Sequence, residues 1–196
     1  MENKPLRACF FVFLAHQALY YLFVSAFLSI FAAEIHPKTM EQLELKSTIS
    51  VCQLEELTAA EQHLIELAIE ATKRSYAPYS HVCVGAAVRL ANGREIIGCN
   101  QENAAYPSGL CAERTALFSA GAQFPEEPIE MLAIAARGTD GELTEEPTGP
   151  CGSCRQVIIE SETRSNKKIR ILLYGRRCIY VIDGIGQLMP LSFTEF

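Results

Sequence analysis

Three cysteines and one glutamate have the residue types and the spacing of a catalytic metal site. Cys151 and Cys154 form a C-x-x-C pair, and Cys111 lies upstream of them, two residues before Glu113. Thiolate sulfur is a common ligand of Zn²⁺, and three protein ligands leave the fourth tetrahedral position open for water. We therefore predict a zinc site formed by the three sulfurs, with Glu113 close to the water without binding the metal.

These residue types suit hydrolysis. Zn²⁺ lowers the pKa of a bound water to about 7, and a carboxylate such as that of Glu113 can carry the water proton to a substrate. Three thiolates oppose that acidification, and Arg114 could offset them by pointing at a sulfur. Each feature alone has a plainer interpretation: a redox pair, half of a structural zinc site, small buried cysteines, or a solvated glutamate. Together, C-x-E followed by P-C-x-x-C is the signature of zinc deaminases, with Cys in place of the first His.

Helices are expected to position these residues. Both cysteine groups fall at predicted helix starts, over 111–122 and 150–162, where Pro suits the first turn. Free N–H groups and a partial positive charge at a helix start lower the pKa of a thiol. A capping box at Thr58 and Glu61 predicts a further helix over about 59–74.

Apolar stretches between these helices predict five strands. They are residues 82–90, 94–99, 129–136, 169–174 and 179–182. Asn92-Gly93 predicts a two-residue hairpin turn between the first two strands. The order of helices and strands predicts an α/β domain, with helices packed on a mixed five-stranded sheet.

Charge and cysteine content restrict the partners and the compartment. The chain has 17 Lys and Arg against 23 Asp and Glu, a formal net charge of −6. Phosphate binding needs excess basic side chains, so we expect no nucleic-acid partner. The cysteines without ligand spacing are Cys9, Cys52, Cys83, Cys99 and Cys178. We interpret them as free thiols, which fit a reducing, cytoplasmic compartment.

The N-terminal segment differs in composition from the rest of the chain. Residues 8–33 are almost entirely apolar, and a helix of that length would span about 39 Å, enough to cross a bilayer. The segment could be a membrane anchor, a signal sequence, or an extension absent from a mature protein that starts at Met40. We favour the third, with a leader over 1–39 and a zinc domain over 40–196. A membrane is a partner only if residues 8–33 are retained.

Five sequence blocks, in order, resemble the cytidine deaminase family. They are Tyr76-Ala77-Pro78-Tyr79-Ser80, Val84-Gly85-Ala86-Ala87, Gly98-Cys99-Asn100-Gln101-Glu102-Asn103-Ala104-Ala105-Tyr106, Cys111-Ala112-Glu113-Arg114-Thr115-Ala116 and Pro150-Cys151-Gly152-Ser153-Cys154-Arg155-Gln156. The resemblance extends from about Leu54 to the C-terminus. It implies a three-layer α/β/α fold, one Zn²⁺ per subunit and a homotetramer with sites completed across subunits.

The resemblance also implies roles for individual residues of the metal site. It implies Cys111, Cys151 and Cys154 as zinc ligands, Glu113 as the proton shuttle, and Arg114 as the arginine that tempers the thiolate charge.

For the substrate, the resemblance implies that Asn100 and Glu102 hydrogen-bond the ribose 3′-hydroxyl. An amide and a carboxylate two residues apart at a strand end do point to the same side. The backbone around Ala112 would meet the amide edge of the pyrimidine. Val82 stands where the family often has an aromatic residue against the base, so it offers a smaller apolar wall. Phe193 resembles an aromatic residue that reaches a neighbouring subunit's site.

The implied reaction is hydrolytic deamination of free cytidine and 2′-deoxycytidine to uridine and 2′-deoxyuridine, with release of ammonia, in pyrimidine salvage. It needs no organic cofactor. Two alternatives stay open: a deaminase for another aminopyrimidine nucleoside of the antibiotic type, and a non-catalytic zinc-binding module tethered to a membrane through residues 8–33. The Asn100 and Glu102 pair favours a substrate that carries a ribose.

Overall fold

The computed structural model of the chain describes residues 19–27 and 40–194. The chain divides into two units, Met1–Glu44 and Leu45–Phe196. In the first unit, residues 19–27 form a short helix with mostly exposed side chains, and the rest of the apolar stretch over 8–33 lies outside the described residues. Among the described residues, no helix has both the length and the apolar character needed to cross a membrane. The division into a leader and a zinc domain at 39/40 stays a prediction.

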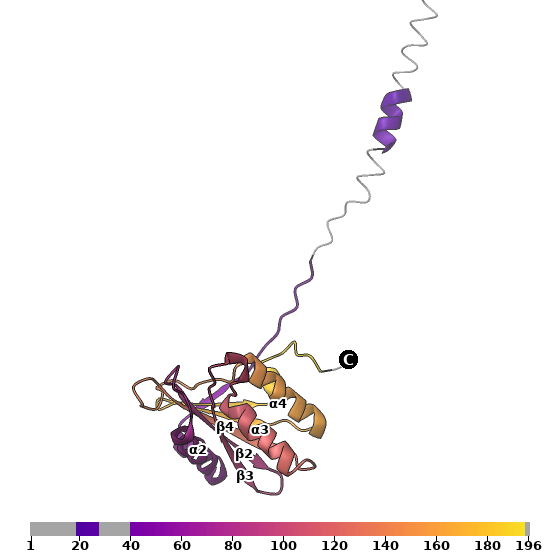
Figure 1. The fold of residues 1–196 in the computed structure, drawn as a ribbon. Helices are drawn as coiled ribbons and strands as arrows, with labels where there is room; N and C mark the ends of the chain where they lie inside the picture. Colours follow the sequence, from indigo (N-terminus) through magenta and orange to yellow (C-terminus); the bar gives the residue numbers. More distant parts are fainter. Residues whose placement is uncertain (1–18, 28–39, 195–196) are drawn as a thin grey trace, which may run out of the picture. The chain divides into compact units, whose positions relative to one another are not determined.

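A mixed six-stranded sheet forms the centre of the second unit (Figure 1). The strands are β1 (Ser50–Cys52), β2 (Cys83–Leu90), β3 (Glu95–Cys99), β4 (Ile129–Arg137), β5 (Arg170–Tyr174) and β6 (Ile179–Asp183). Their order across the sheet is β1-β6-β5-β4-β2-β3. Neighbouring strands are antiparallel except β4 and β5, which are parallel. A parallel pair needs a long crossover, and this crossover contains α4 (Gly152–Ser165).

The sheet has one strand more than the five predicted. The additional strand is β1, which pairs antiparallel with β6 from Ser50 opposite Val181 to Cys52 opposite Ile179. Two of its three residues are exposed, so the segment carries no alternating apolar pattern that could reveal it. The open edge of β6 holds it through backbone hydrogen bonds, which depend little on side-chain type.

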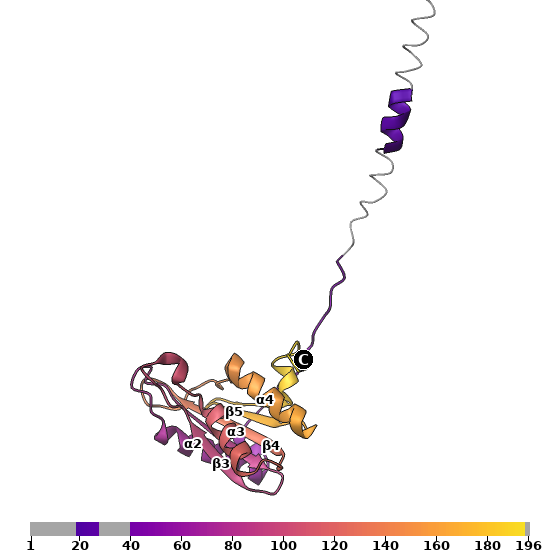
Figure 2. The same ribbon diagram turned by 45° about the vertical axis from the view of Figure 1, so that its right-hand side comes forward.

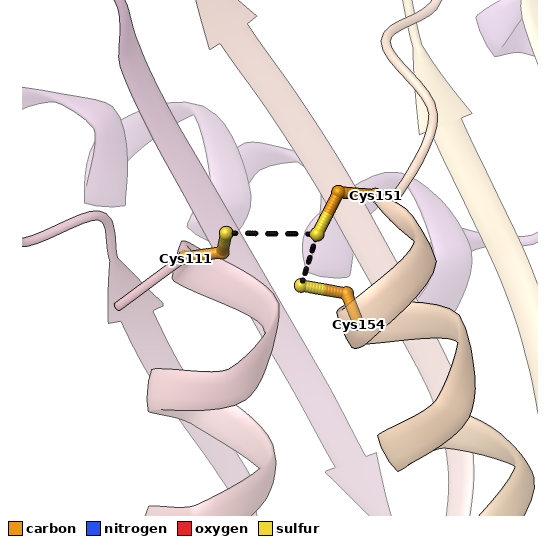
Figure 3. Close-up of side chains that lie close together, drawn as sticks. All are labelled: Cys111, Cys151 and Cys154. Atoms are coloured by element: carbon orange, nitrogen blue, oxygen red, sulfur yellow. Dashed lines mark hydrogen bonds between the residues drawn. The ribbon is translucent and has the colours of Figure 1, made fainter. Parts of the chain in front are cut away.

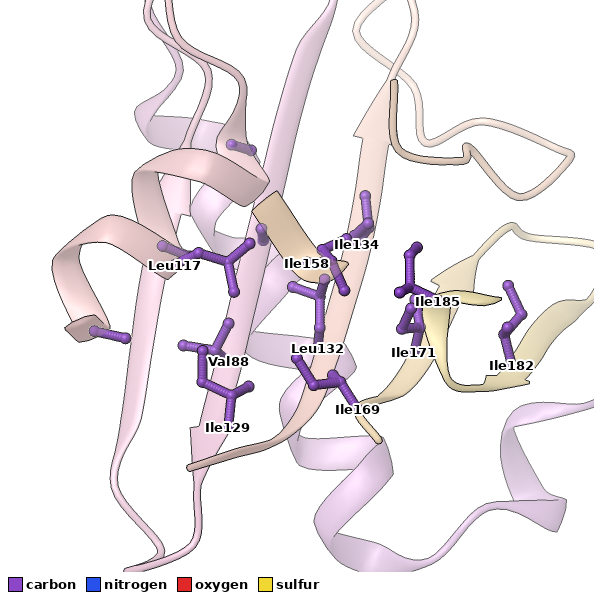
Figure 4. Packing of buried hydrophobic residues seen from close by; sticks show 14 of the residues in the cluster. Val88, Leu117, Ile129, Leu132, Ile134, Ile158, Ile169, Ile171, Ile182 and Ile185 are labelled. Atoms are coloured by element: carbon purple, nitrogen blue, oxygen red, sulfur yellow. The ribbon is translucent and has the colours of Figure 1, made fainter. Parts of the chain in front are cut away.

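Helices cover both faces of the sheet, which confirms the three-layer α/β/α fold. On one face lies α2 (Ala59–Ala71), and on the other lie α3 (Ala112–Gln123) and α4 (Figures 1 and 2). Successive residues of β4 serve the two faces in turn, as expected for a strand buried on both sides. Leu132 and Ile134 belong to the core under α3 and α4, where they lie beside Ile158 (Figure 4). Ala133 and Ala135 belong to the core under α2.

The predicted capping box of α2 is present. The Thr58 hydroxyl accepts a hydrogen bond from Glu61 N at 3.3 Å, and the Glu61 carboxylate accepts one from Thr58 N at 2.8 Å. The predicted start of α4 was wrong by two positions, because the helix begins at Gly152 with Cys151 as its N-cap, and Pro150 precedes the helix instead of forming its first turn. The cysteine side chain therefore lies at the very start of the helix.

The hairpin between β2 and β3 also differs from the predicted two-residue turn. Leu90 N donates to Arg94 O at 2.9 Å, and Gly93 N donates to Leu90 O at 2.8 Å, so three residues form the loop. Gly93 has a φ of +82°, whereas Asn92 is not among the residues with positive φ. The type I′ turn that Asn-Gly favours needs positive φ at both residues, so it cannot form here.

Candidate metal centre

The three predicted ligand cysteines meet where α3 and α4 begin (Figure 3). Cys111 is the N-cap of α3, Cys151 is the N-cap of α4, and Cys154 lies in the first turn of α4. The Sγ atoms of Cys111 and Cys151 are 3.8 Å apart, and those of Cys151 and Cys154 are 3.4 Å apart. All three sulfurs lie within 4.8 Å of one another. Segments far apart in the sequence thus form one cluster.

Close contact with the sheet sets the position of α3. A Cβ added to Gly98 on β3 would lie 2.4 Å from Ala116 N and 2.6 Å from Ala112 O. Only glycine permits the strand backbone to approach the helix this closely. The same helical turn carries Cys111 and Glu113, so this contact fixes how far those side chains stand above the sheet.

The donor set fits zinc. Three sulfurs at about 2.3 Å from a tetrahedral Zn²⁺ lie about 3.8 Å from one another, and the observed separations of 3.4 and 3.8 Å are close to that value. All three cysteines are free thiols rather than disulfide-bonded. Within 19–27 and 40–194, this is the one group of three potential metal ligands. The chemistry and the spacing of the cluster therefore both suit this metal.

The sulfurs influence one another's ionisation. A hydrogen bond with the Cys154 thiol, together with the guanidinium of Arg114, lowers the pKa of Cys111 to about 5. The pKa of Cys154 is raised, because its proton is held in the hydrogen bond with Cys111, the group is buried, and Glu113 is near. One thiol thus ionises readily while its neighbour keeps its proton. A divalent cation would permit the whole set to ionise together.

Arg114 lies against the sulfur cluster. Its Nη2 atom donates to Cys111 Sγ at 3.7 Å. Its Nε atom is buried and has no hydrogen-bond partner among the described residues. The guanidinium is therefore directed at the thiolate that carries the charge, in the orientation that offsets the negative charge of a sulfur ligand set.

Glu113 is buried beside the same cluster, with 4% of its surface exposed. Burial raises the pKa of its carboxyl, and the negative charge of Cys111 adds to the rise. Hydrogen bonds from its own backbone N–H and from the Cys154 thiol act in the opposite direction without cancelling the rise. A carboxyl with a raised pKa can take up and release a proton closer to neutral pH. The site thus holds a titratable carboxyl beside three sulfurs that could bind a metal.

Asn100 and Glu102, the predicted ribose-binding pair, form hydrogen bonds with the residues just before β2 and with the first residues of that strand. Asn100 Oδ1 accepts from Val84 N at 2.8 Å, and Asn100 Nδ2 donates to Val82 O at 2.9 Å. The Asn100 side chain therefore fixes the backbone on both sides of Cys83. This support role was not predicted from the sequence.

Glu102 lies two residues after Asn100, beyond the end of β3, and holds an earlier part of the same segment. Its carboxylate accepts hydrogen bonds from Tyr79 N at 2.9 Å, from Ser80 N at 3.3 Å and from the Ser80 hydroxyl. The Ser80 hydroxyl is the main cause of a lowered pKa at Glu102. The next residue, His81, has a φ of 59°, which is unusual for a residue other than glycine. We call these three bonds the Glu102 clasp.

The remaining predicted site residues are placed as follows. Val82 is half-buried, and its backbone N donates to the Ser80 hydroxyl at 3.1 Å. Ala112 is fully buried as the first residue of α3, where backbone N–H groups have no partner inside the helix. Phe193 is 59% exposed in the C-terminal segment.

Sequence reasoning gave no role to Arg155 and Gln156, although both stand in the last of the five blocks. Arg155 donates from Nε to Pro150 O and from Nη1 to Leu188 O, both at 2.9 Å. Gln156 Nε2 donates to Phe193 O at 2.9 Å. Their position directly after Cys154 was the signal, but the carbonyls of Leu188 and Phe193 are distant in sequence and could not be inferred as partners.

Comparison with known proteins places this site in a family. Residues 58–168 match the family described as the cytidine and deoxycytidylate deaminase zinc-binding region. A cytidine deaminase of Halalkalibacterium halodurans is 42% identical over 133 residues, covering 68% of this chain and 93% of that protein. A cytidine deaminase of Sporosarcina psychrophila is 42% identical over 134 residues, covering 68% of this chain and 91% of that protein.

The solved structures that resemble this chain include cytidine deaminases. The cytidine deaminase of Burkholderia pseudomallei superposes with a TM-score of 0.59 and 38% identity, covering 70% of this chain and 100% of that one. The cytidine deaminase of Mycobacterium tuberculosis gives a TM-score of 0.55 and 30% identity, covering 69% and 98%. The chain therefore belongs to the cytidine and deoxycytidylate deaminase zinc-binding family.

Proposed function

We propose that this chain hydrolyses cytidine and 2′-deoxycytidine to uridine and 2′-deoxyuridine, with release of ammonia, in pyrimidine salvage. The observation that carries the proposal is the convergence of three cysteine sulfurs from two helix starts beside the buried carboxyl of Glu113. The names of the similar proteins support it, since the chain covers 93% and 91% of two cytidine deaminases. Those names give no support to an antibiotic-type or a non-catalytic alternative.

Cys111, Cys151 and Cys154 would hold the zinc ion in this proposal. When bound there, zinc supplies a Lewis acid that brings the pKa of a water to about 7. Arg114, which donates to Cys111 Sγ at 3.7 Å, reduces the negative charge that the sulfurs bring to the site. Its role is to keep the ligand set from weakening that acidification.

Glu113 is the residue that moves protons. It accepts a proton from the attacking water and delivers it to N3 of the pyrimidine while the water oxygen bonds to C4. It then takes the proton of the new hydroxyl at C4 and passes it to the amino group, which leaves as ammonia while the C4 carbonyl forms, so cytidine and water become uridine and ammonia. Its burial keeps bulk water from competing for the proton, and its raised pKa suits transfer in both directions.

Asn100, Glu102, Ala112 and Val82 would hold the nucleoside. The Asn100 amide and the Glu102 carboxylate each use only part of their hydrogen-bonding capacity on the segment they support, which leaves capacity for a ribose hydroxyl. Backbone N–H groups near Ala112 are available to the base, because the first turn of a helix leaves them without internal partners. Val82 provides a small apolar surface in place of an aromatic ring.

We also propose a homotetramer located in the cytoplasm. An exposed Phe193 and a 75% exposed Leu191 in the C-terminal segment support a contact with another subunit. The described cysteines are free thiols, which suits a reducing compartment. The presence of four copies in one particle is a prediction that a mass measurement can check.

The purified full chain tests the proposal in one preparation. Zinc content, the ultraviolet change of cytidine and the release of ammonia are measured together, with Cys154→Ala as a variant that lacks one ligand and Cys178→Ala as its matched control outside the cluster. We expect one zinc per chain, equal amounts of uridine and ammonia, and loss of both zinc and turnover in C154A only. Bound zinc without turnover of either nucleoside would contradict a deaminase.

A further inference from the structure

Arg155 connects two segments that are otherwise far apart in sequence. From α4 its guanidinium donates to the carbonyl of Pro150, which precedes the helix, and to the carbonyl of Leu188 in the C-terminal segment, each at 2.9 Å. The side chain is half-buried, and both of its contacts are backbone oxygens rather than sulfurs. Its function is therefore distinct from that of Arg114, which contacts a thiolate directly.

The C-terminal residues 185–188, which provide one of the two carbonyls, are fixed to the core. Ile185 is 1% exposed, and Leu188 packs against the core under α3 and α4. The Glu162 carboxylate on α4 accepts hydrogen bonds from Ile185 N and from Ile169 N, both at 2.9 Å. The Leu188 carbonyl thus belongs to a part of the chain that is fixed to the core.

The Pro150 carbonyl, at the other end of the connection, needs a hydrogen-bond donor. Pro150 is buried, and a buried carbonyl oxygen without a hydrogen-bond partner is costly. Cys151 follows directly, is exposed, and lies at the end of a long loop that leads from β4 to α4. The Cys151 sulfur contacts the two other sulfurs of the cluster, and where it stands relative to them depends on the backbone that Arg155 holds in place.

We propose that Arg155 is a positioning residue for the metal centre: it holds Cys151 at ligand distance by tying the Pro150 carbonyl to the Leu188 carbonyl. This inference rests on the zinc site proposed above. Because the planar guanidinium makes two bonds in fixed directions, a lysine that keeps the positive charge cannot replace it. Loss of such an outer contact typically weakens metal binding by about 10- to 100-fold.

Zinc release from the loaded full chain to an excess of a chromogenic chelator tests the proposal without any activity assay. We expect Arg155→Gln and Arg155→Lys to release zinc at least about tenfold faster than the parent chain. The matched control is Arg164→Gln, since Arg164 lies on the same helix and donates to a carbonyl, that of Pro125, at 3.2 Å. It lines a separate cavity of about 310 Å³ whose lining contains none of the ligand cysteines, and it should leave release unchanged.

Two further variants separate positioning of Cys151 from a general loss of stability or of C-terminal contacts. Gln156→Ala removes the bond to Phe193 O but leaves the Arg155 contacts, so release should stay at the parent rate. Ile65→Val removes a methylene from the core under α2, and it should lower Tm without faster release. Release at the parent rate in R155Q and R155K would overturn the proposal, as would equally fast release in R164Q or I65V. If R155Q does not fold, R155K decides.

This test is independent of turnover. A chain that binds zinc but deaminates nothing would end the proposed function, and R155Q and R155K would still be compared with the parent chain for release. If the parent chain deaminates normally and both Arg155 variants release zinc at the parent rate, the positioning role of Arg155 is wrong while the proposed function stands.

Discussion

Cys111 and Glu113 lie two residues apart at one helix start, and their surroundings shift the two ionisations in opposite senses. The thiol pKa falls to about 5 through hydrogen bonds with Cys154 and Arg114. The carboxyl pKa rises through burial and the nearby sulfur charge. A metal ligand must lose its proton readily, whereas a proton shuttle must exchange its proton near working pH. The two residues thus have the properties that their different proposed roles require.

Replacement of Glu113 by Gln tests the proton role. The amide keeps the size of the side chain but cannot carry a proton, so we expect deamination to fall by about 10³-fold or more while zinc content stays the same. The control is Glu160→Gln, an exposed glutamate on α4, which should leave turnover unchanged. Near-normal turnover in E113Q would remove the residue from this role.

The Glu102 clasp predicts a pH dependence of stability. Its hydrogen bonds lower the folded pKa of Glu102 from the ordinary value of 4.5. A lowered folded pKa means that the stabilisation is fully present above the ordinary pKa and is lost as pH falls through the folded pKa. Glu102→Gln should therefore be less stable than the parent chain above about pH 5, and the difference should shrink below about pH 4. Urea midpoints of both chains across this range measure it, and a difference that does not change with pH would contradict the clasp.

At the scale of elements, two glycines determine how closely helices approach the sheet. Gly98 meets the first turn of α3, and Gly85 meets α2, where an added Cβ would lie 2.1 Å from Ala68 O. Both glycines stand in strands where a larger residue would be expected to pack better. Their role depends on which helix lies above them, so the sequence alone could not show it.

Gly98→Ala is predicted to disturb both the fold and the metal centre. The new methyl group would overlap the backbone of Ala116 and Ala112, and overpacking of this kind costs about 1–3 kcal/mol. Since α3 must move away from the strand, the affinity for zinc should fall together with the free energy of unfolding. Urea unfolding and zinc titration measure the two effects.

The matched control for that variant is Gly186→Ala. A Cβ at Gly186 meets nothing within 4 Å, and its φ is not positive. It should leave both measurements within error, so that an effect of G98A cannot be assigned to the loss of glycine flexibility in general. Unchanged zinc affinity in G98A would show that α3 is not positioned by this contact.

Elements with a local signal were predictable, and those that depend on distant partners were not. The capping box at Thr58 and Glu61 marked the start of α2, and apolar runs marked five of the six strands. The short strand β1 depends on the open edge of β6. The connection that Arg155 makes depends on the backbone carbonyl of Leu188, which is distant in sequence. In the metal centre, spacing predicted which cysteines would meet, because two helix starts converge. It could not predict that Asn100 and Glu102 also hold the segment that includes Tyr79.

At the scale of the whole molecule, the resemblance implies that subunits complete one another's sites. Phe193 is the residue through which this chain would do so, and its ring is 59% exposed while Gln156 holds its backbone carbonyl. An exposed aromatic side chain adds little to the stability of its own subunit. We therefore expect Phe193→Ala to fold and to lose part of its activity.

Mixing two defective chains tests whether that loss arises in a neighbouring subunit. E113Q lacks the proposed proton shuttle but keeps Phe193, and F193A has the reverse defect. If Phe193 serves another subunit's site, mixed particles contain sites in which an intact Glu113 meets an intact Phe193, so activity should rise above the sum of the separate chains. Unfolding and refolding the chains together forms the mixed particles, and light scattering checks that four chains of 21.7 kDa assemble. No gain in a confirmed mixed tetramer would mean that Phe193 acts within its own subunit or not at all.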